Sequence, residues 1–282
     1  MFTIKGCLTI LTDNVVPGKS TAIGEHGFCI FVETDNGNFL FDTGRGKTII
    51  HNAHVYNKNL NVINKIVLSH NHGDHTGGIQ EVLFGVRHKP IDVYAHEDLF
   101  LPRFKREKDT DEYQGIPFTR GHLERLGAHF VFNRAFAEIE AGIFLTGEVP
   151  RQTLFEKADM ENRFMVLNGE KVPDTIEDDQ SMVVHTEKGL LLVLGCAHAG
   201  IINVVNYVLE KTGIQDIFAI IGGTHIGFSG EVQLNESIAA LKTYNIQHLI
   251  PSHCTGPLAI ARMKQEFDDI FQFSHVGFCL EF

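Results

Sequence analysis

The sequence has no tryptophan and only eight prolines among its 282 residues, and no apolar run in it is long enough to cross a membrane. A transmembrane helix needs roughly 20 predominantly apolar residues. The first residues, MFTIKGCLTILTDN, are too short and too often interrupted by polar side chains to form a signal peptide. We therefore expect a soluble, cytoplasmic protein without a membrane partner.

Cysteines are few and scattered. The five of them, at positions 7, 29, 196, 254 and 279, include no CxxC pair and are odd in number. This pattern predicts neither a disulfide framework nor a zinc knuckle, and it suits a reducing compartment.

Basic residues are also scarce, because 24 Lys+Arg stand against 35 Asp+Glu and give a formal net charge of −11. Such a balance repels the phosphate backbone of nucleic acids on average, within the range that salt screening allows. We expect a small-molecule substrate and no nucleic-acid partner. The sequence alone does not determine an oligomeric state.

Apolar runs alternate with amphipathic helical patterns, which predicts an α/β protein of one domain over residues 1–282. Residues 101–180 contain the charged stretch RFKREKDTDE with Gly and Pro, and we interpret them as an irregular insertion or flap. Strands are predicted at 3–12, 28–33, 38–42, 65–69, 91–94, 181–186, 190–194, 216–221, 248–251 and 276–282, and helices at 78–84, 201–211, 235–244 and 258–266.

The segment IVLSHNHGDHTGG at 66–78 places three histidines and an aspartate directly after a predicted strand. Imidazole nitrogens and a carboxylate are ligands that zinc, iron and manganese accept. A tight turn would let His70 and His72 converge on one ion, while Asp74 and His75 point toward a second position about 3.5 to 4 Å away. We therefore predict one or two divalent ions, with zinc as the first choice and manganese or iron as alternatives.

Three further histidines follow predicted strands. They are His198 in GCAHAG, His225 in GGTH and His253 in PSHCTG. Ligands of α/β sheets gather beyond the carboxyl ends of the strands, so these side chains are expected at the same edge as the 70–75 cluster. Each alone could be a structural histidine, but together they favour metal ligation by His198 and His253.

HNHGDH, together with FDTG at 41–44, resembles the metallo-β-lactamase superfamily. The segments TDN at 12–14, EHG at 25–27 and DDQ at 178–180, with the three histidine motifs above, are similar to one branch that includes archaeal pterin-forming synthases. The resemblance implies an αββα sandwich with the metals at one edge. It also implies that Asp42 orders the ligands without binding a metal itself.

The sequence departs from typical hydrolases of that superfamily at two ligand positions. In place of the usual third-motif histidine stands DDQS, which offers Asp178 or Asp179, and in place of a bridging aspartate stands GCAH, which offers Cys196 or His198. We predict His198 and Asp179 as ligands and Cys196 as a small buried thiol beside the site.

Four residues are candidates for catalysis or substrate binding. Asp74 would hold the second metal and orient the nucleophile, and His225 would donate a proton. Arg103 and Arg106, in the charged stretch, are candidates for contacting a substrate phosphate, against the alternative that they lie on a solvated face.

The resulting function is a metal-dependent hydrolase that acts on a small ester or phosphoester through a metal-activated water. The resemblance implies one alternative, a transferase that joins a dihydropterin pyrophosphate to an aromatic ribose phosphate acceptor. A second alternative, a non-catalytic metal-binding module, is disfavoured by the intact HxHxDH motif.

Overall fold

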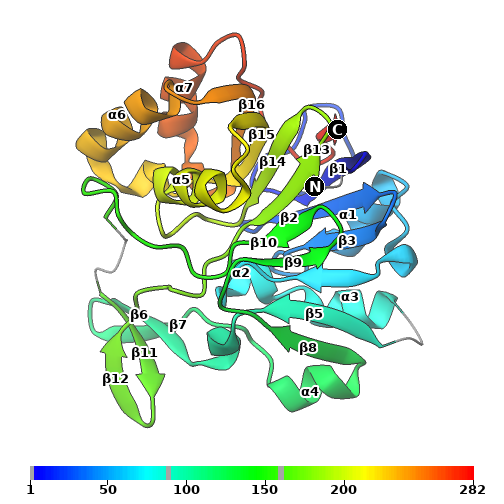
Figure 1. Ribbon diagram of the computed structural model, residues 1–282. Helices are drawn as coiled ribbons and strands as arrows, with labels where there is room; N and C mark the ends of the chain where they lie inside the picture. Colours follow the sequence, from blue (N-terminus) through cyan, green and yellow to red (C-terminus); the bar gives the residue numbers. More distant parts are fainter. Residues whose placement is uncertain (1–2, 87–89, 158–161) are drawn as a thin grey trace.

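The computed structural model describes residues 3–86, 90–157 and 162–282, and two β-sheets lie face to face at its centre (Figure 1). The first sheet has seven strands, and β3, β4, β5 and β8 run parallel to one another. Its order is β17 (Cys279–Glu281), β1 (Gly6–Thr12), β2 (Cys29–Thr34), β3 (Gly37–Phe41), β4 (Lys65–Val67), β5 (Ile91–Ala95) and β8 (Ala128–Phe132).

The second sheet has six strands, and β14, β15 and β16 are parallel. Its order is β16 (Asn245–Ser252), β15 (Asp216–Gly223), β14 (Gly189–Leu194), β13 (Met182–Thr186), β10 (Ile143–Leu145) and β9 (Ala137–Glu140). All six residues of β14 are buried, as expected for a parallel strand covered on both faces.

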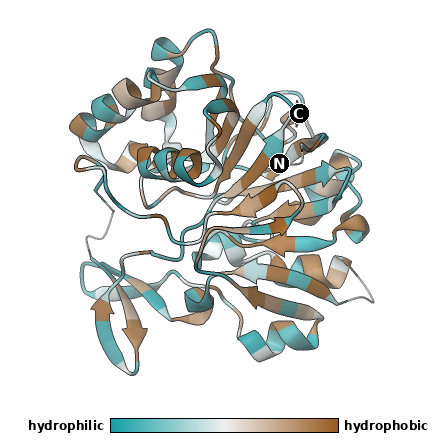
Figure 2. Ribbon diagram, in the orientation of Figure 1, coloured by the Kyte–Doolittle hydropathy of each residue, from teal (hydrophilic) through white to brown (hydrophobic). Residues whose placement is uncertain are grey.

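Three apolar layers hold the sheets and helices together. One layer, which includes Phe41 and Val193, lies between the two sheets. A second packs the first sheet against α1 (Ile49–Val55), α3 (Ile79–Gly85) and α4 (Arg120–Arg125), and a third packs the second sheet against α5 (Ile201–Thr212), α6 (Gly230–Leu241) and α7 (Pro257–Glu266). Figure 2 shows the apolar residues concentrated in the strands and on one side of the helices. The predicted αββα sandwich is confirmed.

A third, four-stranded sheet stands beside the sandwich (Figure 1) and is formed by two segments that are far apart in the sequence. Strands β6 (Arg103–Glu107) and β7 (Thr110–Tyr113) come from one segment, and β11 (Arg163–Leu167) and β12 (Glu170–Pro173) come from the other. Strand β6 pairs with β11 and so joins the two segments.

The interpretation of 101–180 as irregular is therefore wrong for the described residues. Besides the small sheet, this stretch supplies α4 and strands β8, β9 and β10 of the two main sheets. Residues 158–161 lie outside the described part. The sequence showed no apolar alternation here because β6 and β7 carry charged residues on both faces, and their only rings, Phe104 and Tyr113, pack with Phe164 of β11. That residues 1–282 form a single domain stays a prediction.

Helix α1 was also missed, because its sequence IIHNAHV buries only Ile49, Asn52 and Ala53. The one-turn helix α2 (Gly73–Thr76) is too short to have a periodic pattern. Within the described ranges no helix has the length and apolar character needed to cross a bilayer.

The N-terminus of α5 is closed by the carboxylate of Glu156. Its Oε1 accepts a hydrogen bond from the backbone N–H of Ile202 and its Oε2 one from that of Asn203, each at 2.8 Å. The backbone of Gly200 approaches this carboxylate so closely that a Cβ would lie 2.2 Å from Oε2. Glu156 thereby holds α5 next to the GCAHAG turn. Burial raises the pKa of its carboxyl to about 7, although the two N–H donors act in the opposite direction.

This raised pKa predicts a pH-dependent contribution to stability. Between the ordinary glutamate pKa of 4.5 and the folded pKa of about 7, Glu156 holds a proton that the unfolded chain has released, so its contribution is lost as pH rises. We expect Glu156→Gln to reduce the fall in unfolding free energy between pH 5 and pH 8 by up to about 3 kcal/mol. Urea unfolding of both proteins measures this. Glu210→Gln, at an exposed glutamate of the same helix, is the control, and identical pH dependences in all three proteins would contradict the assignment.

Candidate metal centre

The carboxyl ends of strands from both sheets meet at one edge of the sandwich. Residues 69–75 follow β4, and residues 195–198 follow β14 in the opposite sheet. Gly195 makes this approach possible, because a Cβ there would lie 2.2 Å from Oγ of Ser69. A second close contact, 2.1 Å between a Cβ built on Gly78 and the carbonyl oxygen of Thr43, shows how tightly the FDTG and HNHGDHTGG segments pack.

Asp42 connects these segments and is fully buried. Its Oδ1 accepts from the backbone N–H of Ser69, and its Oδ2 accepts from Oγ of Ser69 and from Nδ1 of His75, all at 2.7 Å. Because Nδ1 of His75 is engaged in this way, its Nε2 is directed to the other side of the ring, toward Cys196. Asp42 thus has the contacts of a residue that orients a ligand, which is the role implied by the resemblance.

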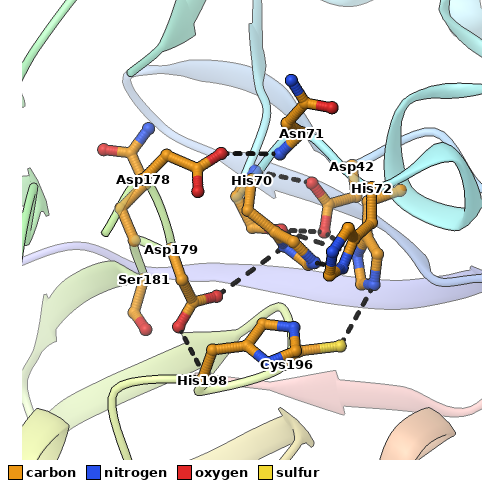
Figure 3. Close-up of polar contacts among 12 residues, drawn as sticks. Asp42, His70, Asn71, His72, Asp178, Asp179, Ser181, Cys196 and His198 are labelled. Carbon is orange, nitrogen blue, oxygen red and sulfur yellow. Dashed lines mark hydrogen bonds and ion pairs between the residues drawn. The ribbon is translucent and has the colours of Figure 1, made fainter. Parts of the chain in front are cut away.

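His70, His72 and His198 converge in the close-up of Figure 3. Nε2 of His70 lies 2.9 Å from Nδ1 of His72, and the ring of His198 lies 4.9 Å from that of His70 and 5.1 Å from that of His72. Nε2 of His72 and both ring nitrogens of His198 are buried without a hydrogen-bond partner among the described residues. Buried polar atoms without partners are costly unless something binds them, and a metal ion supplies that partner.

The protonation states of these three histidines suit metal binding. Burial lowers the pKa of each imidazole well below its usual value, and neighbouring cations and imidazoles add to the effect. They are therefore neutral at pH 7 and have lone pairs available for a cation.

Asp74 lies at the centre of a second group. Its Oδ2 lies 3.2 Å from Nε2 of His26 and 3.2 Å from Nε2 of His253. Nδ1 of His253 contacts Oδ1 of Asn14 at 3.0 Å, which fixes the orientation of the ring. Burial acts to raise the pKa of Asp74, but the imidazoles of His75, His253 and His26 close to its carboxylate outweigh burial and hold the pKa well below its usual value. Asp74 is therefore ionised, as a metal ligand must be.

Cys196 lies between the two groups. Its Sγ is 3.2 Å from Nε2 of His75. Among the described residues, four sets of three residues have potential ligand atoms within 4.8 Å of one another. Three of these sets contain Cys196: His70–Cys196–His198, His75–Cys196–His253 and Cys196–His225–Cys254. The fourth set is His26–Asp74–His253. This position makes Cys196 a candidate ligand, and the expectation that its thiol only packs beside the site stays a prediction.

Asp179 is engaged differently from the other predicted ligands. Its Oδ2 accepts a hydrogen bond from the backbone N–H of His198 at 2.7 Å, and its Oδ1 lies 3.7 Å from Nδ1 of His70. It belongs to none of the four combinations within the described residues. Its carboxylate supports the His198 turn, and its role as a ligand stays a prediction.

Four residues at this edge have left-handed backbone conformations although none is glycine. Asp42, Ala197, His225 and His253 have φ angles of 58°, 54°, 53° and 47° and follow β3, β14, β15 and β16. Each such residue costs on the order of 1 kcal/mol or more, and strained residues of this kind cluster at functional sites. The strain lets each turn direct a side chain back over the sheet edge.

A pocket of about 270 Å³ opens over this edge. His72, Asp74, Cys196, His198, His225 and His253 line it, together with Arg163 and Lys105 of the small sheet. His225 is thus placed beside the other predicted residues, 4.4 Å from His198 between ring centres. Its proposed role as a proton donor stays a prediction.

Arg103 and Arg106 are not part of the pocket lining. Arg103 is 1% exposed, and its two Nη atoms pair with Asp174 at 3.1 Å and Asp178 at 2.8 Å. Asp178 in turn accepts from the backbone N–H of Asn71 at 2.8 Å, so Arg103 supports the histidine loop from behind. Arg106 is bonded to Asp111 at the surface. Burial and two ion pairs hold Arg103 away from the pocket, and an exposed ion pair with Asp111 holds Arg106 outside its lining. Substrate contact by either residue stays a prediction that this arrangement does not favour.

The pocket also contains residues that the sequence analysis missed, among them His26, Cys254 and Arg163, and it contains Lys105 of the charged stretch. His26 and Cys254 lie within motifs that the resemblance identified, EHG and PSHCTG, but their spacing to the histidine cluster gives no local signal. Lys105 and Arg163 are brought to the site only by the pairing of β6 with β11.

Known proteins resemble this chain along most of its length. A family model described as the metallo-beta-lactamase superfamily matches residues 22–158. The 7,8-dihydropterin-6-methyl-4-(beta-D-ribofuranosyl)-aminobenzene-5'-phosphate synthase of Methanocaldococcus jannaschii is 32% identical, over 92% of this chain and 90% of its own. An uncharacterised protein of the same organism is 30% identical, over 96% and 98%. A crystal structure of a metal-dependent hydrolase of the beta-lactamase superfamily aligns with a TM-score of 0.83 and 26% identity, over 98% and 99%.

Removing two imidazoles tests the metal centre. We expect the double variant His70→Ala, His72→Ala to lose most of its bound metal and to stay folded, because both residues follow a strand in a turn and their loss leaves the three apolar layers intact. Elemental analysis gives the metal content, and circular dichroism reports folding. His129→Ala, at an exposed histidine of β8, is the control. Full occupancy in the double variant would rule out this centre.

Single substitutions in the GCAH turn measure how much His198 and Cys196 each contribute to metal affinity. We expect both His198→Ala and Cys196→Ser to weaken zinc or manganese binding by about 10-fold or more, since even the loss of a residue that only orients a ligand has an effect of that order. Titration with each metal measures the affinity. Cys279→Ser, at an exposed thiol of the edge strand β17, is the control. Unchanged affinity in Cys196→Ser would show that this thiol only packs beside the site.

Proposed function

The chain belongs to the metallo-β-lactamase superfamily, and from this premise we propose that it is a metal-dependent hydrolase of a small phosphoester or ester. The observation that carries the proposal is the pair of buried, neutral imidazoles of His72 and His198 that line the pocket. Nε2 of His72 and both ring nitrogens of His198 lack hydrogen-bond partners among the described residues. Bound divalent ions supply Lewis acidity at the substrate oxygen and lower the pKa of a coordinated water.

The candidate ligands form two groups, each of which could hold one ion. His70, His72 and His198 would hold one ion, and Asp74, His75 and His253 a second, with Cys196 between them. Asp42 keeps Nδ1 of His75 protonated: burial acts to lower the pKa of this imidazole, but the carboxylates of Asp42 and Asp74 raise it to about 9. Without a bound cation His75 is therefore protonated at pH 7, and metal binding must displace the proton at Nε2.

The reacting group of the substrate lies between the floor and the small sheet. Asp74 accepts a hydrogen bond from the attacking nucleophile and orients it. His225, at the exit of β15, donates a proton to the leaving group. The turn at His225 is left-handed and adjoins Phe228, whose ring lies 4.9 Å from the imidazole and also lines the pocket.

A second candidate is a transferase that joins a dihydropterin to an aromatic ribose phosphate acceptor. It is favoured by the synthase of Methanocaldococcus jannaschii, whose 32% identity extends over 92% of this chain. The same residues would then bind the leaving group of the donor, and the pocket would exclude water from the bond that forms.

The two candidates are distinguished by product analysis of the metal-loaded protein. For the hydrolase we expect metal-dependent release of p-nitrophenol from p-nitrophenyl phosphate, bis(p-nitrophenyl) phosphate or p-nitrophenyl acetate, and a rate lower by about 100-fold or more in Asp74→Asn because one ligand and the orienting carboxylate are lost together. His129→Ala should keep the full rate. Formation of a condensation product from a dihydropterin pyrophosphate and its acceptor, with no p-nitrophenol from any ester, would favour the transferase.

A further inference from the structure

The small sheet of β6, β7, β11 and β12 presents one face to the pocket. Lys105, Glu107 and Glu112 line the pocket, as does Arg163. On the other face the ring of Phe104 stacks on that of Phe164 at 5.3 Å. Because side chains alternate along a strand, Lys105 and Glu107 lie on the face opposite Phe104, whereas Arg106 shares the face of the rings.

Arg163 and Lys105 are direct cross-strand partners in the pairing of β11 with β6. Two like charges placed directly opposite each other destabilise a sheet. Lys105 has some compensation, since its Nζ lies 3.1 Å from Glu107 and Glu112 is its partner on β7. Both side chains line the same pocket beside the histidines, and two adjacent cations there suit the binding of an anion between them.

The pocket is lined by equal numbers of basic and acidic side chains. The kind of ligand that it attracts therefore depends on where each charge lies. Arg45, Lys105 and Arg163 stand against Asp74, Glu107 and Glu112. Arg45 is held by a hydrogen bond from its Nε–H to the carbonyl of His26. Arg163 acts directly on the imidazoles: burial is the main cause of the low pKa of His72 and of His198, and the positive charge of Arg163 lowers both further.

We infer that Arg163 and Lys105 together bind the phosphoryl group of the substrate beside the metal centre. This inference rests on the proposed function, because the anion is the substrate's own phosphate. The guanidinium of Arg163 can donate two parallel hydrogen bonds to a phosphate, and the ammonium of Lys105 supplies a second charge-assisted donor. The sheet thus determines which substrates reach the metals, while the two main sheets hold the ligands.

Binding of a non-hydrolysable anion tests this without any turnover. The probe is phenylphosphonate, titrated calorimetrically into the metal-loaded protein, with benzamide as a neutral probe of similar size. We expect Arg163→Gln and Lys105→Gln each to raise the Kd for phenylphosphonate by about 10-fold or more, as the loss of a charge-assisted hydrogen bond predicts. Arg163→Lys should lose less, because it keeps the charge and only loses the bidentate geometry.

Arg106→Gln is the matched control, since Arg106 is the next residue of β6 and its side chain is bonded to Asp111 outside the pocket. Its Kd for phenylphosphonate should equal that of the unchanged protein. Should Arg163→Gln fail to fold, Lys105→Gln decides alone. Wild-type affinity in Lys105→Gln and Arg163→Gln, or an equal loss in Arg106→Gln, overturns the inference.

The outcomes also separate this inference from the proposed function. Weaker phenylphosphonate binding in the two variants, without hydrolysis of any ester by the unchanged protein, supports the anion site and contradicts the hydrolase. Rapid phosphoester hydrolysis with an unchanged Kd in both variants supports the hydrolase and contradicts the anion site.

Discussion

The carboxylate of Asp42 is the contact on which the arrangement of the metal centre depends. It is buried, and a buried carboxylate is tolerated only when its oxygens accept enough hydrogen bonds. Ser69 supplies two of these donors and His75 the third, so the same bonds that stabilise the charge fix the exit of β4 and the orientation of one imidazole. The other ligands are then placed relative to His75, because the thiol of Cys196 lies against Nε2 of that ring.

Several turns around this contact have strained backbone conformations that bring the histidine side chains together. Ala197, His225 and His253 have left-handed backbones where β14, β15 and β16 end, and the strands themselves are largely buried. A parallel sheet can hold such turns because its hydrogen bonds and apolar packing outweigh the cost of a few strained residues. Packed strands and strained turns together keep several imidazoles close before any cation binds, which lowers the reorganisation needed for binding.

Residues 101–180, which appeared irregular in sequence, contribute both to the support of the histidine loop and to the lining of the pocket. Arg103 lies at the start of β6 and ties the DDQ loop to the small sheet through Asp178 and Asp174. Two residues later the same strand carries Lys105 into the pocket. One strand therefore connects the ion pairs behind the histidine loop with the lining of the pocket.

The sequence by itself determined the α/β class, the position of most strands and the local cluster His70 to His75, because apolar periodicity and a six-residue motif are local signals. It also placed three further histidines at strand ends. Only the tertiary structure decided which distant side chains meet: Arg103 turned inward to two carboxylates, Cys196 came between the ligand groups, and Arg163 came opposite Lys105. The physical reason is that strand register and the packing of one sheet on another depend on contacts across the whole chain, which no short pattern records.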